Sequence, residues 1–186
     1  MNVLVVVDMQ NDFIDGALGT KEAQAIVPNV VERIIMAIGG GEHVFYTRDT
    51  HGENYLETQE GFNLPIAHCI KDTYGWEIHP DIEVMRFAVE ESRIYTFDKN
   101  TFGSVKLAEA LKDLDADLIS NSGKGLESIT FIGLCTDICV ISNAMLTKAY
   151  LPDVPIIVDS KCCAGVTPES HKTALEAMKA CQIQIK

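Results

Sequence analysis

Short apolar runs alternate with helical patterns along this chain. The apolar runs are continuous and rich in valine and isoleucine, and they cover residues 2–7, 43–46, 93–97, 128–134 and 154–159. Continuous runs of this length are typical of strands that are buried on both faces, as the strands of a parallel sheet are. The run at 182–186 is a candidate for a further strand at the edge of that sheet.

Helical patterns lie between these runs, where apolar residues recur at intervals of three and four. They cover residues 27–38, 104–114, 136–150 and 167–181. The alternation of strands and helices predicts right-handed crossovers. We therefore expect a single domain over residues 1–186 with a doubly wound, Rossmann-like α/β fold, in which a mostly parallel sheet of about six strands has helices on both faces. A different α/β strand order stays open at this stage.

The overall composition limits the partners that the chain can have. Of its 186 residues, 47% are apolar and 23% are charged, and the formal net charge is −12. Such an acidic chain is not expected to bind nucleic acid or an anionic membrane surface. No apolar run approaches the ~18 residues of a membrane span. The sequence therefore predicts neither a nucleic-acid partner nor a membrane partner.

The N-terminal residues and the cysteines bear on the compartment. The apolar stretch at 2–7 has no basic residue before it and an acid after it, which indicates a buried strand rather than a signal peptide. The six cysteines are scattered and lack the paired spacing of a zinc ribbon. Free thiols without a secretory signal predict a cytoplasmic protein.

Residues with reactive side chains follow the predicted strands. Asp8 follows the first strand, and Asp49 and His51 follow the second. Lys99 follows the third strand, and Cys139 follows the fourth after a short turn. In an open parallel sheet, ligands bind beyond the carboxyl ends of the strands, where the strand order reverses. We therefore expect these side chains to lie together at one end of the sheet.

The two cysteines of the segment FIGLCTDICV, Cys135 and Cys139, admit several interpretations. Cys139 lies near the start of a predicted helix, where unpaired N–H groups and the helix dipole stabilise a thiolate. Lys99 would lower the pKa of that thiol further if it lay beside it. The alternatives are that both cysteines are small packing residues or that they form a strained disulfide. For Lys99, the alternative is a solvated loop lysine.

The segment TRDTH, residues 47–51, is a candidate metal site. Asp49 and His51 are two residues apart in an extended segment, so their side chains point to one side. With His68, they would offer one carboxylate and two imidazoles to Zn²⁺ or another first-row ion. A set of hydrogen-bonded loop residues is the alternative interpretation.

These segments together resemble the isochorismatase-like cysteine hydrolases, and within them the nicotinamidases. The resemblance covers nearly the whole chain and rests on VVVDMQNDF (5–13), TRDTH (47–51), LPIAHC (64–69), DKNTFGS (98–104) and GLCTDICV (133–140). The first and last of these segments together are quite specific. The fold of that family is the doubly wound sheet expected above.

The resemblance implies a catalytic triad of Asp8, Lys99 and Cys139. It also implies a cis peptide bond between Leu134 and Cys135, and an oxyanion hole formed by the backbone N–H groups of Cys135 and Cys139. The implied reaction is hydrolysis of a small carboxamide to an acid and ammonia through a cysteine thioester. Nicotinamide, converted to nicotinate, is the first expectation for the substrate.

The resemblance also implies a bound divalent metal. Its ligands would be Asp49, His51 and His68. Glu60 or Glu57 would supply a further ligand from the loop between the two histidines. Zinc is the expected ion, with iron or manganese as alternatives, because imidazole and carboxylate suit all three.

The substrate pocket of the resemblance would include Phe13, which matches an aromatic residue of the family. Leu64 stands where many nicotinamidases have an aromatic residue that stacks on the pyridine ring. This departure keeps open an amidase for carbamoyl or ureido compounds, although such relatives commonly lack the metal ligands. A non-catalytic or redox relative of the same fold is the remaining alternative. Relatives often assemble as homo-oligomers, which the resemblance implies here as well.

Overall fold

The computed structural model describes residues 1–87 and 93–186 and contains one sheet. Its strands are β1 (Asn2–Val7), β2 (His43–Asp49), β3 (Ile94–Lys99), β4 (Ser128–Leu134), β5 (Ile156–Ala164) and β6 (Gln184–Ile185). Their order is β3-β2-β1-β4-β5-β6, and every pair of neighbours is parallel. The predicted doubly wound α/β fold is therefore confirmed, with the reversal of strand order between β1 and β4.

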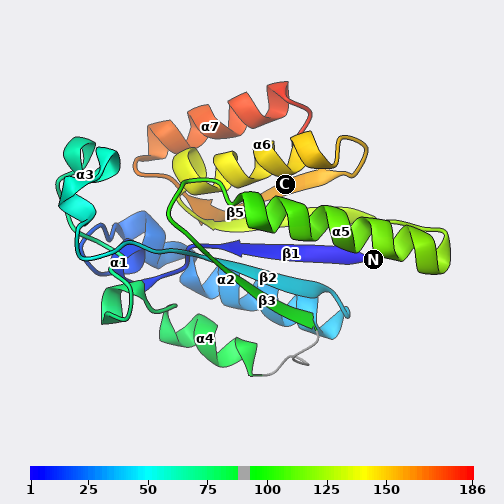
Figure 1. Cartoon of the computed structure of the whole chain (residues 1–186), viewed down its shortest axis with the longest axis horizontal. Helices are drawn as coiled ribbons and strands as arrows, with labels where there is room; N and C mark the ends of the chain where they lie inside the picture. The colour runs from blue at the N-terminus through cyan, green and yellow to red at the C-terminus, as the bar shows by residue number, and fades with distance from the viewer. Residues whose placement is uncertain (88–92) are drawn as a thin grey trace.

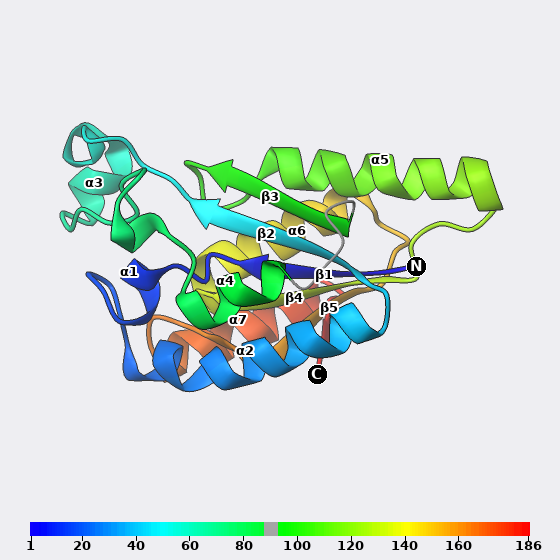
Figure 2. The same cartoon turned by 90° about the horizontal axis from the view of Figure 1, so that it is seen from below.

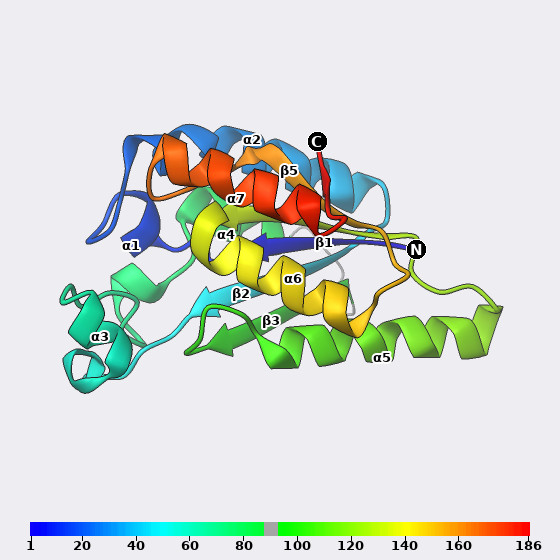
Figure 3. The same cartoon turned by 90° about the horizontal axis from the view of Figure 1, so that it is seen from above.

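Helices cover both faces of this sheet, as predicted. They are α1 (Asn11–Ile14), α2 (Lys21–Gly39), α3 (Gln59–Asn63), α4 (Pro80–Arg86), α5 (Val105–Ser122), α6 (Ile141–Tyr150) and α7 (Pro168–Ala180). Helices α5, α6 and α7 lie on one face, and α2 and α4 lie on the other (Figures 1, 2 and 3). Helices α1 and α3 lie beyond the carboxyl ends of the strands, toward which the arrow of β1 points in Figure 1.

The central strand β1 explains why the apolar runs are continuous. Val3, Val5 and Val7 belong to the core on the side of α5, α6 and α7. Leu4 and Val6 belong to the core on the side of α2 and α4. Because the side chains of a strand alternate between its two faces, a strand that is covered on both sides is apolar at every position.

Several strands are longer than the hydrophobic pattern predicted. Strands β2 and β3 continue through polar residues to Asp49 and Lys99, which are partners in the parallel register. Strand β5 runs on to Ala164, past a register shift against β4. Backbone pairing rather than hydrophobicity sets these ends. The extension of β2 and β3 places Asp49 and Lys99 side by side at the carboxyl end of the sheet.

The helix bounds also differ from the predicted ones. Helix α2 begins at Lys21 rather than at residue 27, because the Thr20 side chain caps it by accepting a hydrogen bond from the Ala23 N–H. The predicted helix 136–150 is divided into one π-helical turn, η4 (Thr136–Val140), and α6. Within the ranges 1–87 and 93–186, no helix is both long and apolar enough to cross a membrane.

Candidate active site

Asp8 lies directly after β1, and its side chain is fully buried. Its φ of 46° is in the left-handed region, which residues other than glycine rarely adopt. Backbone conformations of this kind cluster at functional sites. The Thr47 hydroxyl donates a 2.6 Å hydrogen bond to Asp8 Oδ1. Burial raises the pKa of Asp8, although the neighbouring Lys99 opposes that rise. A carboxyl group of this kind is suited to accept a proton.

Lys99, at the end of β3, is buried among acidic groups rather than solvated. Its Nζ lies 2.7 Å from Asp8 Oδ2 and 3.4 Å from Asp49 Oδ1. It also lies 3.4 Å from Cys139 Sγ. Burial alone would lower the pKa of Lys99, but Asp8, Cys139 and Asp49 raise it well above its ordinary range. The ammonium group is therefore a fixed positive charge, and the loop-lysine alternative is wrong.

Cys139 lies in the turn η4, with 5% of its side chain exposed. We expected Lys99 and a helix start to lower the pKa of its thiol, and this expectation is wrong. Burial and the adjacent Asp8 raise the pKa well above its ordinary range, and the opposing effect of Lys99 is smaller. The raised pKa favours the neutral form of the Cys139 thiol.

Cys135 precedes the turn η4, and the bond between Leu134 and Cys135 is cis, as the resemblance implied. Cys135 and Cys139 are both free thiols, so they do not form the disulfide that stayed open above. The Cys135 carbonyl accepts hydrogen bonds from the N–H groups of Ile138 and Val140, which close the turn around Cys139.

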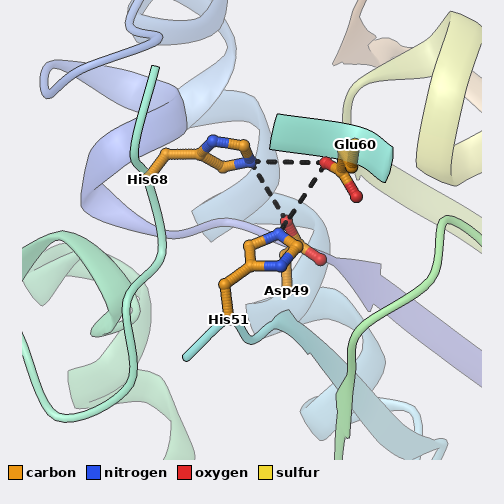
Figure 4. A group of neighbouring side chains, drawn as sticks. All are labelled: Asp49, His51, Glu60 and His68. Atoms are coloured by element: carbon orange, nitrogen blue, oxygen red, sulfur yellow. Dashed lines mark hydrogen bonds and ion pairs between the residues drawn. The ribbon is translucent and has the colours of Figure 1, made fainter. Parts of the chain in front are cut away.

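The predicted metal ligands come together in one cluster (Figure 4). Asp49, His51, Glu60 and His68 each offer a ligand atom, and these atoms lie within 4.8 Å of one another. His51 Nε2 and His68 Nε2 lie 2.9 and 3.4 Å from Asp49 Oδ2, and each lies 3.7 Å from Glu60 Oε1. Glu57, the other glutamate considered, is exposed and lies outside this cluster.

The chemistry of this cluster fits a divalent transition metal. Two imidazoles and two carboxylates are a donor set that suits zinc, iron or manganese. His68 Nδ1 lies 2.8 Å from the Ile66 carbonyl oxygen, a partner that leaves Nε2 directed at the cluster. Hydrogen bonds with His51 and His68 outweigh burial and lower the pKa of Asp49, so this carboxylate is ionised and ready to bind a cation.

Gln10 is a residue of the site that the sequence analysis did not identify. Its side chain is fully buried. The Gln10 Nε2 donates 2.8 Å hydrogen bonds to the carbonyl oxygens of Asp49 and Trp76. The Gln10 Oε1 accepts a 2.7 Å hydrogen bond from the Asp49 N–H. One amide thus fixes both backbone groups of Asp49. The available signal was a glutamine at the third position after a buried strand, where an uncompensated polar side chain is costly.

Replacing Gln10 with glutamate is expected to weaken zinc binding by about 10–100-fold, the usual effect of losing a residue that holds a metal ligand in place. The carboxylate cannot donate to the carbonyl oxygens of Asp49 and Trp76, so Asp49 loses its fixed position. Competition with a chromogenic chelator would measure the affinity. The control is Gln24→Glu, an exposed position on α2. Equal zinc affinity in Gln10→Glu and Gln24→Glu would show that the Gln10 contacts do not position the ligand.

A cavity of about 1050 Å³ opens beside these groups. Its inner wall includes Cys135, Cys139 and the metal cluster residue Asp49. Phe13 and Leu64, the two residues expected in the substrate pocket, also line it. The thiol and the metal cluster therefore face one shared space, in which a single small molecule would meet both.

The strand order and the position of the cavity define the class of protein. It is a doubly wound α/β protein whose cysteine, lysine and aspartate are buried together where the strand order reverses. Residues 2–185 match the Isochorismatase domain, and the chain belongs to that family.

Relatives and solved structures of similar proteins agree with this assignment. The chain is 24% identical to the nicotinamidase/pyrazinamidase of Mycobacterium tuberculosis over 197 residues, which cover 100% of this chain and 98% of that protein. It resembles the crystal structure of a pyrazinamidase/nicotinamidase from Streptococcus mutans, with 25% identity, a TM-score of 0.80 and full coverage of both chains. It also resembles the pyrazinamidase of Pyrococcus horikoshii in complex with zinc, with 27% identity, a TM-score of 0.77 and coverage of 100% and 98%.

Proposed function

We propose that this chain is a cysteine amidohydrolase that converts a small carboxamide to its acid and ammonia, with nicotinamide as the first candidate substrate. It is a hydrolase acting on amide C–N bonds. One observation carries the mechanism: Lys99 Nζ lies 2.7 Å from the Asp8 carboxylate and 3.4 Å from the Cys139 sulfur, and Cys139 lines the same cavity as the metal cluster. Amidase relatives along the whole chain support the same reaction.

In the proposed reaction, Asp8 moves one proton in each half. The Cys139 Sγ bonds to the amide carbon as its proton passes to Asp8, and the Lys99 ammonium stabilises the negative charge. When the C–N bond breaks, Asp8 returns the proton to the nitrogen, which leaves as ammonia. Water then adds to the thioester carbon and gives a proton to Asp8. Breaking the S–C bond releases the acid, and the proton returns to Cys139.

The negative oxygen of each tetrahedral intermediate needs hydrogen-bond donors. We assign this role to the backbone N–H groups of Cys135, which precedes the turn η4, and Cys139, which lies within it. Preorganised N–H donors in a site that excludes water typically contribute about 10²–10³-fold to the rate. The fixed hydrogen bonds of this turn keep both groups in place.

Asp49, His51, Glu60 and His68 would hold the metal ion. The bound ion would supply a Lewis-acid contact for the ring nitrogen of a heteroaromatic amide and thereby orient it. Asp49 belongs to both halves of the site, because its Oδ2 faces the histidines and its Oδ1 faces Lys99. Phe13 packs against the His68 ring at 5.5 Å between centroids and closes one side of the cavity.

Replacing His51 with alanine removes a metal ligand and is expected to weaken metal binding strongly. The loss should exceed the roughly 10–100-fold that follows when a residue that only positions a ligand is lost. Nicotinamide turnover should fall with it. Alkylation of Cys139 by iodoacetamide should change little, because the metal does not generate the nucleophile in this mechanism. Elemental analysis, ammonia release and mass mapping of Cys139 would measure the three quantities. His79→Ala, at the N-cap of α4 and outside the metal cluster, is the matched control.

An ammonia-release screen would test the function itself. The compounds are nicotinamide, pyrazinamide, and a carbamoyl and a ureido compound. Turnover of nicotinamide by protein loaded with zinc is the expected result. Full nicotinamide activity in a protein that elemental analysis shows to be metal-free would contradict the orienting role of the cluster. If only the carbamoyl or the ureido compound were hydrolysed, that class of compound would be the substrate instead of nicotinamide.

A further inference from the structure

The cavity continues outward from Cys139 along a wall of apolar side chains that the proposed chemistry does not use. Phe102, Ile138 and Val166 lie on this wall, and each comes from the segment that follows a different strand, β3, β4 or β5. Leu18, from the segment before α2, lines the same cavity. Phe102 and Val166 remain 47% and 51% exposed, although large apolar side chains are usually covered.

Hydrogen bonds hold the backbone of both exposed residues in place. The Asn143 Nδ2 donates a 3.2 Å hydrogen bond to the Phe102 carbonyl oxygen and a 2.8 Å bond to that of Cys139. The Asp137 carboxylate accepts the N–H of Val166 at 3.1 and 3.3 Å. The outer wall is therefore tied to the turn that carries Cys139. The backbone that carries these apolar side chains is thereby held in place, which is typical of a preformed binding site.

The outer part of the cavity is also uncharged. Among the described residues that line the whole cavity, none is lysine or arginine, and the acidic ones, Asp49 and Glu60, belong to the metal cluster. The remaining polar lining consists of His51 of the metal cluster, Tyr55, and threonine, asparagine and glutamine side chains. A carboxylate or phosphate on a substrate would thus meet no positive partner there, in a chain whose net charge is −12.

We propose that this outer wall binds an uncharged apolar substituent of the amide substrate, with Phe102 and Val166 as the residues that determine specificity. The substrates would then be neutral amides with an apolar body that extends beyond a single ring. Amides that carry a carboxylate would be excluded. The cavity volume of about 1050 Å³ slightly exceeds the ~300–1,000 Å³ of sites that enclose drug-sized ligands, so it has room for more than a single ring. This inference rests on the proposed amidase function.

The test compares kcat/KM for ammonia release among three kinds of amide. They are nicotinamide, nicotinamides with a propyl group at ring position 5 or 6, and the same compounds with a carboxylate at the end of the chain. The better propyl compound is expected to exceed nicotinamide by about 10-fold or more, because even one methylene group in an apolar pocket is worth about 10–200-fold. The carboxylates should show no gain.

Two variants locate the effect. Phe102→Ser and Val166→Ser should each lower kcat/KM for the propyl compound about 10-fold more than for nicotinamide. Phe62→Ser is the matched control, since Phe62 is 86% exposed on α3 and does not line the cavity. It should leave the ratio of the two substrates unchanged.

Several results would overturn the inference. Turnover of nicotinamide without any gain for the propyl compounds, or an equal gain for the carboxylates, would do so and leave the proposed function intact. If no amide were hydrolysed, the proposed function would fail. Calorimetric binding to the Cys139→Ala variant would then decide the inference. Tighter binding of propyl amides than of carboxylates would support it, and equal or reversed affinities would overturn it.

Discussion

Replacing Cys139 with alanine is expected to abolish amide hydrolysis, with a loss of kcat on the order of 10⁴-fold or more. Without the thiol, no thioester forms, and the remaining groups only bind and polarise the substrate. The variant should still fold, because alanine fills most of the volume of a cysteine that is 5% exposed. Ammonia release under single-turnover and steady-state conditions would measure the loss.

The matched control for this experiment is Cys135→Ala. In the proposed mechanism, Cys135 contributes its backbone N–H, which alanine retains, so much of the activity should remain. Both cysteines line the same cavity, and both are free thiols, so the comparison isolates the nucleophile. Substantial turnover by Cys139→Ala would contradict the thioester mechanism.

Replacing Asp8 with asparagine is expected to move hydrolysis and thiol alkylation in opposite directions. Hydrolysis should fall by about 10²–10⁴-fold, because the group that carries the proton is lost. Alkylation of Cys139 at pH 7 should become faster. Burial and Asp8 raise the pKa of this thiol, so the pKa should fall when the Asp8 charge is removed, although burial and Asp49 still oppose Lys99. The thiolate fraction grows about tenfold for each unit by which the pKa falls.

Iodoacetamide labelling followed by mass mapping would measure that alkylation across a range of pH. In the unchanged protein, labelling of Cys139 should rise only above the ordinary thiol range, so the exposed Cys181 should react first. Asp15→Asn is the matched control, because Asp15 is exposed and in the same segment. Slower labelling of Cys139 in Asp8→Asn would mean that Asp8 already deprotonates the thiol in the resting protein.

The sequence predicted the sheet well because hydrophobic burial determines its strands. Each of the first five apolar runs overlaps a strand, and the last run contains β6. The segment between β2 and β3 was not predicted as helical, yet it contains α3 and α4. Helix α4 is held in part by a contact with a distant residue, since the N–H of its N-cap residue His79 donates a hydrogen bond to the Met9 carbonyl oxygen. A local pattern cannot report such contacts.

For the candidate site, the sequence predicted which residues take part but not the surroundings that set their properties. Residue type and position after a strand were enough to select Asp8, Lys99 and Cys139, which the structure brings together. The direction of the Cys139 pKa was mispredicted, because it depends on complete burial and on the distance to Asp8. The choice of Glu60 over Glu57 also required the path of the loop.

The strand ends that build the site are far apart along the chain. The residues joined by the hydrogen bonds of Thr47 with Asp8, of Lys99 with Asp49, and of Lys99 with Cys139 are separated by 39, 50 and 40 positions. Contacts of such high contact order form only after the entropy of closing long loops has been overcome. Recovery of amidase activity during refolding should therefore lag behind far-ultraviolet circular dichroism. A proteolytic fragment that lacks any one of β1 to β4 should have no residual turnover.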